Sequence, residues 1–313
     1  MNMNRLSKVV RHIDRDVHIT YIVPNGNYCR SNQVSVRLSS EYNRKKLPVH
    51  LEKNISKIWS EHFTGNPRLW NGTKFRMDSL EEKSDGNGVT FNLGITCYKD
   101  FIGTNWSPNA EELLRLGQQD HNNSQAYMSD AFGVGSLVRT ADECFILLRR
   151  SEHCGEAVGL LDIPGGHPEP KEVVGKAEAS EIEFDKMSPD DVVQELFDST
   201  RREIIDEVNI PSPFLAQPQL MGIVRNMTNG GKPSSEYYTS CTLTSHDIKQ
   251  RYLEGDHSEA YESTNINFIP MSAIMTLQDK KSVWDELAPS AKGCITLYQL
   301  CESLRKQQNS ARV

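Results

Sequence analysis

The apolar positions of this chain fall into short segments separated by polar turns, and their spacing predicts both strands and helices. Alternating or clustered apolar residues predict strands, whereas a repeat of three or four, as at Leu51, Ile55 and Ile58, predicts a helix. Strands are expected at residues 18–23, 33–38, 89–97, 136–139, 144–149, 160–163, 219–225, 237–243 and 266–269. Helices are expected at residues 49–63, 110–116, 192–208 and 286–305. Because polar residues 121–124 interrupt the pattern, we place a soft domain boundary near residue 130.

The helix expected at residues 192–208 carries the run Arg202-Glu203-Ile204-Ile205-Asp206-Glu207. On a helix, Glu203 and Glu207 stand one turn apart on one face, with Asp206 at its edge. Like charges this close repel each other unless they are neutralised, and a hard divalent cation with oxygen ligands would neutralise them. A solvated acidic helix face is the alternative for such a run.

The segment before this helix changes the balance between these two interpretations. Residues 157–163 are mostly apolar and run into Pro164-Gly165-Gly166, which predicts a strand followed by a tight glycine turn. A strand, a Gly-Gly loop and an acidic helix resemble the signature of the Nudix hydrolases. Five residues occupy signature positions in its second half: Arg202, Glu203, Ile204, Glu207 and Ile210.

The resemblance has three departures. Asp206 replaces a glutamate, and Asn209 replaces the glycine that ends the helix, which asparagine can do because it also adopts left-handed backbone. The intermediate glutamate position holds Gln194, with Glu195 beside it. About 22 residues are inserted between Gly166 and Arg202, and we expect the polar residues 171–191 to form this insertion as a surface excursion.

The resemblance implies an α/β fold: a Nudix α/β/α sandwich on a mixed β-sheet at residues 131–313, with a smaller N-terminal α+β domain at residues 1–130 that contributes to substrate recognition. Residues 98–106, 164–170 and 290–293 resemble a branch of the family that hydrolyses UDP-glucose and UDP-galactose to UMP and hexose 1-phosphate. The similarity covers roughly residues 50–300. It implies a small nucleotide sugar as the substrate and Mg²⁺, or Mn²⁺ in its place, as the cofactor.

The same resemblance implies the metal ligands. They are Glu203, Glu207, Asp206 and the backbone carbonyl of Gly165 or its neighbour Gly166, with Glu203 and Glu207 also counted as catalytic. Arg202 is expected to orient a carboxylate.

The general base comes from different places in this family. Glu262 is our first candidate and Glu259 the second, with Glu195 and Glu169 left open.

Substrate contacts are expected from the aromatic segment at residues 98–106 and from two cations. The predicted residues are Tyr98, Thr104, Asn105, Trp106, Arg225 and Lys292. Core packing is the alternative for Tyr98 and Phe101, and a surface salt bridge is the alternative for Arg225. His167, in the glycine loop, is assigned to loop packing before Pro168.

Composition excludes several classes of protein. The net charge of −7 argues against a nucleic-acid scaffold, and no apolar run approaches the length of a membrane span. Seven scattered cysteines without a C-x-x-C pair, together with the lack of an apolar core in residues 1–8, favour a cytoplasmic or nuclear setting. Oligomeric state and hexose preference stay open. A Nudix hydrolase of another nucleotide and a non-catalytic nucleotide-binding module remain the alternative functions.

Overall fold

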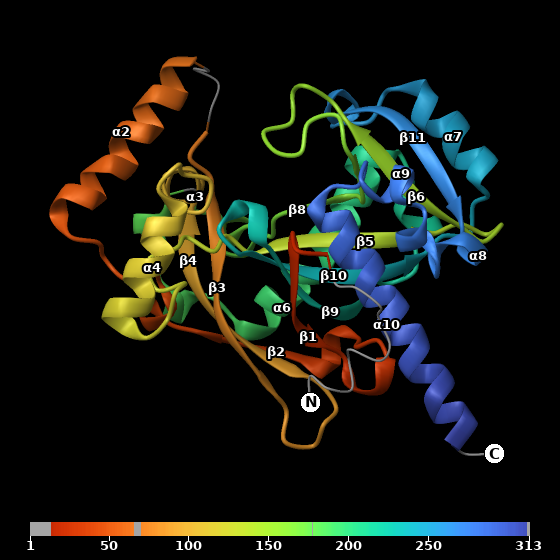
Figure 1. The fold of residues 1–313 in the computed structure, drawn as a ribbon, viewed down its shortest axis with the longest axis horizontal. Coiled ribbons are helices and arrows are strands. Elements are labelled where there is room, and N and C mark those ends of the chain that lie inside the picture. The colour runs from red at the N-terminus through yellow and green to blue at the C-terminus, as the bar shows by residue number, and fades with distance from the viewer. Residues whose placement is uncertain (1–13, 66–69, 177, 312–313) are drawn as a thin grey trace.

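The computed structural model describes residues 14–65, 70–176 and 178–311 and is built around two β-sheets (Figure 1). Residues 1–8, which contributed to the expected cytoplasmic setting, lie outside these ranges. The larger sheet has eight strands in the order β1-β9-β10-β5-β6-β11, with β7 beside β6 and β8 beside β5. Its strands are β1 (Val17–Ile22), β5 (Gly133–Arg139), β6 (Cys144–Arg150), β7 (Leu161–Asp162), β8 (Gly165–Gly166), β9 (Gln219–Asn226), β10 (Lys232–Ser240) and β11 (Ser263–Pro270).

This larger sheet is mixed and is covered by a helix on each face. β10 and β5 run parallel, whereas β1–β9, β9–β10 and β6–β11 are antiparallel. Adjacent residues of β10 point to opposite faces, as the pleat requires. Tyr237 packs against Phe197 of α6 (Pro189–Val208), and Tyr238 stacks on Tyr298 of α10 (Pro289–Ala311). The predicted α/β/α sandwich on a mixed sheet is therefore confirmed.

The smaller sheet comprises β2 (Val34–Leu38), β4 (Val89–Cys97) and β3 (Thr73–Glu82), in that order. It is accompanied by α2 (Val49–Gly65), α3 (Tyr98–Gly103) and α4 (Ala110–His121). Its apolar side chains, Phe91 among them, belong to the same buried cluster as Val134 of the larger sheet. β1 pairs with β9 in the larger sheet although it precedes residue 130. The division at residue 130 stays a prediction, and the core is continuous across it.

The remaining helices pack around the two sheets. They are α5 (Pro170–Val174), α7 (Ser245–Glu254), α8 (Met271–Ile274) and α9 (Lys281–Trp284), and several single 3₁₀ turns connect the elements. None of the helices in the described part of the chain combines the length and the apolar character needed to cross a bilayer.

Several elements were absent from the expectations, and β3 and α3 are two of them that border the cleft described below. β3 alternates apolar and charged residues, and it buries Phe75 and even Arg76 although it is an edge strand of the smaller sheet. Tyr98–Gly103 is the helix α3, directly after β4, in the aromatic segment to which no helix was assigned. The region expected as a polar excursion also differs, because Ile182 and Met187 are buried in the main core. These two apolar side chains hold the insertion against the fold.

The helix that carries the acidic residues has well-defined ends. Ser188 caps its first turn, with Pro189 at the first helical position, where a missing backbone N–H costs nothing. Asn209 ends it with φ of 64°, in the left-handed region that the sequence predicted for this residue.

Candidate active site

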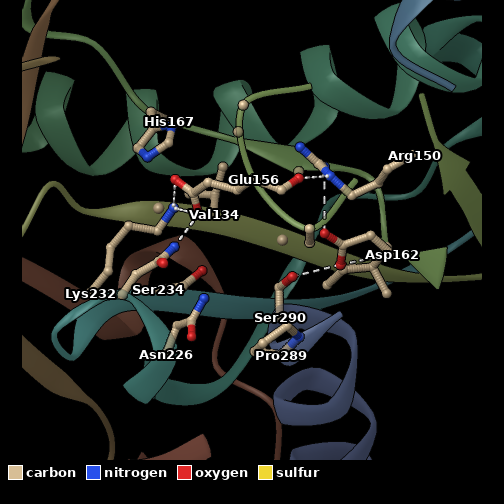
Figure 2. Close-up of a pocket in the computed structure, with 18 of the residues that line it drawn as sticks. Val134, Arg150, Glu156, Asp162, His167, Asn226, Lys232, Ser234, Pro289 and Ser290 are labelled. Carbon is tan, nitrogen blue, oxygen red and sulfur yellow. Dashed lines mark hydrogen bonds and ion pairs between the residues drawn. The ribbon is translucent and has the colours of Figure 1, made fainter. Parts of the chain in front are cut away.

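A cleft of about 680 Å³ opens between the two sheets and the loops that connect them (Figure 2). This volume lies in the usual range for small-molecule sites. Its lining comes from β3, the segment around α3, β5, the glycine loop, α6, β9, β10 and the start of α10. Tyr98, Trp106, Gly165, Glu203, Glu262 and Lys292, all predicted site residues, line it.

Three carboxylates converge at the end of this cleft nearest α6. Glu203, Glu207 and Glu259 each offer an oxygen within 4.8 Å of the others. Glu203 and Glu207 come from one face of α6, as predicted, and Glu259 comes from the segment before β11. Glu259 is positioned by its backbone N–H, which donates to the Asp206 carbonyl at 3.0 Å. The Asp206 carboxylate accepts a hydrogen bond from the Ser258 hydroxyl at 2.7 Å, so Asp206 also ties this segment to α6.

Burial and mutual repulsion disfavour the charged forms of these acids. The pKa of Glu203 is raised to about 8 by burial and by the nearby Glu259 and Glu262. Burial and Glu203 raise the pKa of Glu207 well above its usual range, and burial together with Glu262 raises the pKa of Glu259 to about 7. Glu207 is only 5% exposed, so a solvated acidic helix face does not describe this cluster. An all-oxygen donor set whose like charges need neutralising fits a hard divalent cation.

The glycine loop shapes the cluster from the side opposite α6. The Gly165 N–H donates to the Glu207 carboxylate at 3.0 Å and so orients it. A Cβ at Gly166 would lie 2.0 Å from Oε1 of Glu203, so only glycine leaves room for that carboxylate. The predicted metal contact through the Gly165 carbonyl stays a prediction.

Glu195, which follows Gln194 at the irregular signature position, supplies a buried carboxylate there. α6 turns Gln194 outward and Glu195 inward, where the Glu195 carboxylate accepts hydrogen bonds from Arg202 at 2.6 Å and from the Glu169 N–H at 3.0 Å. This pairing joins α6 to the glycine loop and gives Arg202 the orienting contact expected for it. Glu169, another residue left open as the base, pairs with Lys74 and Lys171.

Glu262 is held at the cleft by its backbone. It ends a 3₁₀ turn, Ala260–Glu262, and its carbonyl accepts from the Ser151 N–H at 2.8 Å. The Ser151 hydroxyl binds the neighbouring Tyr261 carbonyl at 2.7 Å. The Glu262 side chain lines the cleft close enough to Glu203 to raise its pKa.

Four cationic side chains line the cleft, and each has an acidic partner. Lys292 pairs with Asp14 at 3.1 Å and Asp16 at 3.4 Å, and Arg150 pairs with Asp162 at 3.5 Å. Lys74 pairs with Glu169, and Lys232 with Glu156 at 3.2 Å.

Burial and the proximity of Lys232 and Lys74 hold the pKa of His167 well below its usual range, so its imidazole is neutral. Lys74, Arg150, Glu156 and Lys232 belong to no motif in the sequence, and no pattern there could have singled them out.

Three of the predicted substrate residues lie in a buried network behind the cleft lining. Thr104 and Asn105 are 0% and 2% exposed. The Asn105 amide exchanges hydrogen bonds with the Asp130 carboxylate and N–H at 3.0 and 2.8 Å. Arg225 forms an ion pair with the same Asp130 at 3.0 Å. These residues fix the junction between the two sheets, whereas Tyr98, Trp106 and Lys292 reach the cleft itself.

One more buried acid, Glu236 on β10, lies in the cleft wall. It is 0% exposed, and neither carboxyl oxygen has a hydrogen-bond partner. Burial raises its pKa to about 8. A Cβ at Gly135 would lie 2.6 Å from one of these oxygens, so glycine is what lets the carboxyl fit there.

Comparison with known proteins relates this geometry to a family. The uridine diphosphate glucose pyrophosphatase NUDT22 of Mus musculus is 40% identical over 288 residues, which cover 91% of both chains. The Homo sapiens protein of the same name is 39% identical over 289 residues, covering 91% of this chain and 93% of that one. Nudix hydrolase 9 of Arabidopsis thaliana is 32% identical over 278 residues and 86% of each chain. No family model matches the chain.

Solved structures with a similar chain path include the MutT protein from Methanosarcina mazei Go1 and a mutT/nudix family protein from Listeria innocua. The first has a TM-score of 0.31 and 17% identity, and the match covers 56% of this chain and 94% of that one. The second has a TM-score of 0.34 and 14% identity, covering 57% and 96%. The assignment rests on the sequence relatives, which align along nearly the whole chain: the protein belongs to the Nudix hydrolase family.

Proposed function

We propose that this protein hydrolyses the diphosphate of UDP-glucose and UDP-galactose, releasing UMP and glucose 1-phosphate or galactose 1-phosphate, in a reaction that depends on Mg²⁺ or Mn²⁺. The observation that carries the proposal is the cluster of Glu203, Glu207 and Glu259, of which Glu203 and Glu259 line a cleft large enough for a nucleotide sugar. The names of the mammalian relatives support the substrate class.

The substrate's charge explains why this cluster is needed. A diphosphate is polyanionic and repels an attacking hydroxide, and a bound Mg²⁺ would neutralise phosphate oxygens and acidify a bound water. Glu203, Glu207 and Glu259 would hold the ion, with the Gly165 N–H fixing the Glu207 carboxylate. Asp206 would hold a further ion or water at the edge of this cluster.

The other cleft residues have complementary roles in the proposal. Glu262 faces the cluster and would take a proton from the attacking water. Lys74 lies near His167 beside the glycine loop, and it would bind the phosphate group that the metal does not hold. Tyr98 and Trp106 offer aromatic surface for the base.

The test is release of UMP and hexose 1-phosphate from a panel of UDP-, ADP- and GDP-sugars, with and without Mg²⁺. We expect metal-dependent cleavage confined to UDP-glucose and UDP-galactose. Cleavage of another nucleotide would keep the Nudix chemistry and refute the substrate, and no cleavage at all would favour the non-catalytic binding module.

A matched pair of variants tests the cluster. Glu207→Gln should lower kcat at least ~100-fold, because it removes a charged ligand from the buried site. Its control is Glu81→Gln, which breaks the exposed ion pair between Arg37 of β2 and Glu81 of β3 and should leave turnover unchanged. Full turnover by Glu207→Gln would show that this cluster does not hold the catalytic metal.

A further inference from the structure

Three polar side chains from separate segments form a compact array on the cleft wall. The Glu156 carboxylate, from the loop between β6 and β7, accepts hydrogen bonds from Lys232 at 3.2 and 3.3 Å and from the Asn229 amide at 2.5 Å. Figure 2 shows Glu156 extending toward Lys232, while its backbone carbonyl accepts from the Arg150 guanidinium at 2.9 Å. The carboxylate therefore lies between two donors, and all three side chains line the cleft.

The array is held rigidly. The ammonium group of Lys232 lies 5.1 Å from the centre of the Phe101 ring, in a cation–π contact. Asn229 is 7% exposed, and its carbonyl accepts from the Asn105 amide at 3.4 Å. The buried network that contains Asn105 therefore also positions the array. Preorganised groups of this kind discriminate between ligands at a low cost in ordering.

Aromatic surface lies directly beside the array. A Cβ at Gly155, the residue before Glu156, would contact the Trp106 ring at 3.4 Å and the Tyr98 hydroxyl at 3.6 Å. Trp106 and Tyr98 each stack on the buried Phe101, with ring centres 6.4 and 6.1 Å apart. A planar group with a hydrogen-bonding edge would meet aromatic surface and polar partners together at this place.

We propose that Lys232, Glu156 and Asn229 read the imide edge of uracil and so determine the base specificity of this cleft. The imide presents an acceptor, a donor and an acceptor, namely O4, N3–H and O2. The array presents the complementary order, a donor, an acceptor and a donor. Cytosine presents an amino donor and an acceptor nitrogen at the first two positions, so it would set its N3 against the Glu156 carboxylate. An acceptor fixed by two hydrogen-bond donors and set against another acceptor is what makes such a site selective.

This inference rests on the proposed function, because it names the group on the UDP-sugar that the cleft selects. Binding of the nucleotide product in the absence of metal isolates it from the chemistry. The probes are UMP, CMP and N3-methyl-UMP, titrated calorimetrically into the full-length protein in EDTA. N3-methyl-UMP keeps both carbonyls and has a methyl group in place of the N3–H.

We expect the wild-type protein to bind UMP more tightly than CMP or N3-methyl-UMP by roughly 10- to 100-fold, the usual effect of a hydrogen bond to a charged group. Glu156→Gln, whose amide can donate to N3 of cytosine, should lose most of both preferences. Glu81→Gln is the matched control and should keep them.

Two results would overturn the inference. One is a wild-type protein that binds the three nucleotides equally, or binds none of them, a result that does not depend on any variant folding. The other is a Glu156→Gln variant that keeps the wild-type preferences. The proposed function fails separately, if the wild-type enzyme cleaves no UDP-sugar in the presence of Mg²⁺ while it still prefers UMP in this titration.

Discussion

Replacing the buried Glu236 with glutamine changes how the stability of the metal-free protein depends on pH. Glu236 is fully buried, both its oxygens lack hydrogen-bond partners, and burial, with Asp162 adding to it, raises its pKa from 4.5 to about 8. The folded protein thus holds this proton more tightly than the unfolded chain does. The stability that results is complete below pH ~4.5 and is lost as the pH rises to about 8.

The expected size follows from the same shift. One pKa unit corresponds to about 1.4 kcal/mol, so this one carboxyl lowers the free energy of unfolding by roughly 2–3 kcal/mol between about pH 5 and pH 7. Glutamine has nearly the same shape and does not titrate, so the variant lacks this loss. Titration of the acid cluster at Glu203 affects both proteins and cancels in the difference.

The assay is urea unfolding in EDTA at half-unit steps from pH 5 to pH 8. The wild-type curve should fall below that of Glu236→Gln by a growing margin, which levels off near pH 8. Glu81→Gln should follow the wild type, because Glu81 is exposed. Parallel curves for the wild type and Glu236→Gln would refute the reasoning, since they would mean that Glu236 ionises in the folded protein as readily as in the unfolded chain.

Three further predictions concern the cluster and its supports. Gly166→Ala should abolish activity while leaving the melting temperature within a few degrees, since its Cβ would lie 2.0 Å from a Glu203 oxygen; normal turnover would contradict the contact. Arg202→Met should lower stability by about 1–2 kcal/mol in urea unfolding, because the buried Glu195 loses its ion-pair partner, and an unchanged midpoint would contradict this. Mg²⁺ affinity, measured by calorimetry, should rise at least about tenfold from pH 6 to pH 8, because protons held with pKa values of about 8 on Glu203 and about 7 on Glu259 compete with the metal. A flat affinity profile would mean that these carboxyls are not the ligands.

Local spacing was enough to find the acidic face of α6 from the sequence. A helix repeats every 3.6 residues wherever it lies, so Glu203 and Glu207 share a face independently of the rest of the fold. The helix end at Asn209 follows from that residue's own backbone preference, and the sandwich was implied by the resemblance to the Nudix hydrolases. The resemblance to a Nudix signature rests on the same local strings.

Tertiary structure alone decided which distant groups meet these acids. Glu259 reaches the cluster from 52 residues beyond Glu207, and Lys232 meets Glu156 across 76 residues. Asp130 binds Arg225, and Asp14 and Asp16 bind Lys292, so the charge that each cation presents to a ligand depends on partners that no local pattern shows. The physical reason is range: backbone periodicity and capping act over a few residues, whereas burial and ion pairing depend on which segments the fold brings within a few ångströms of each other.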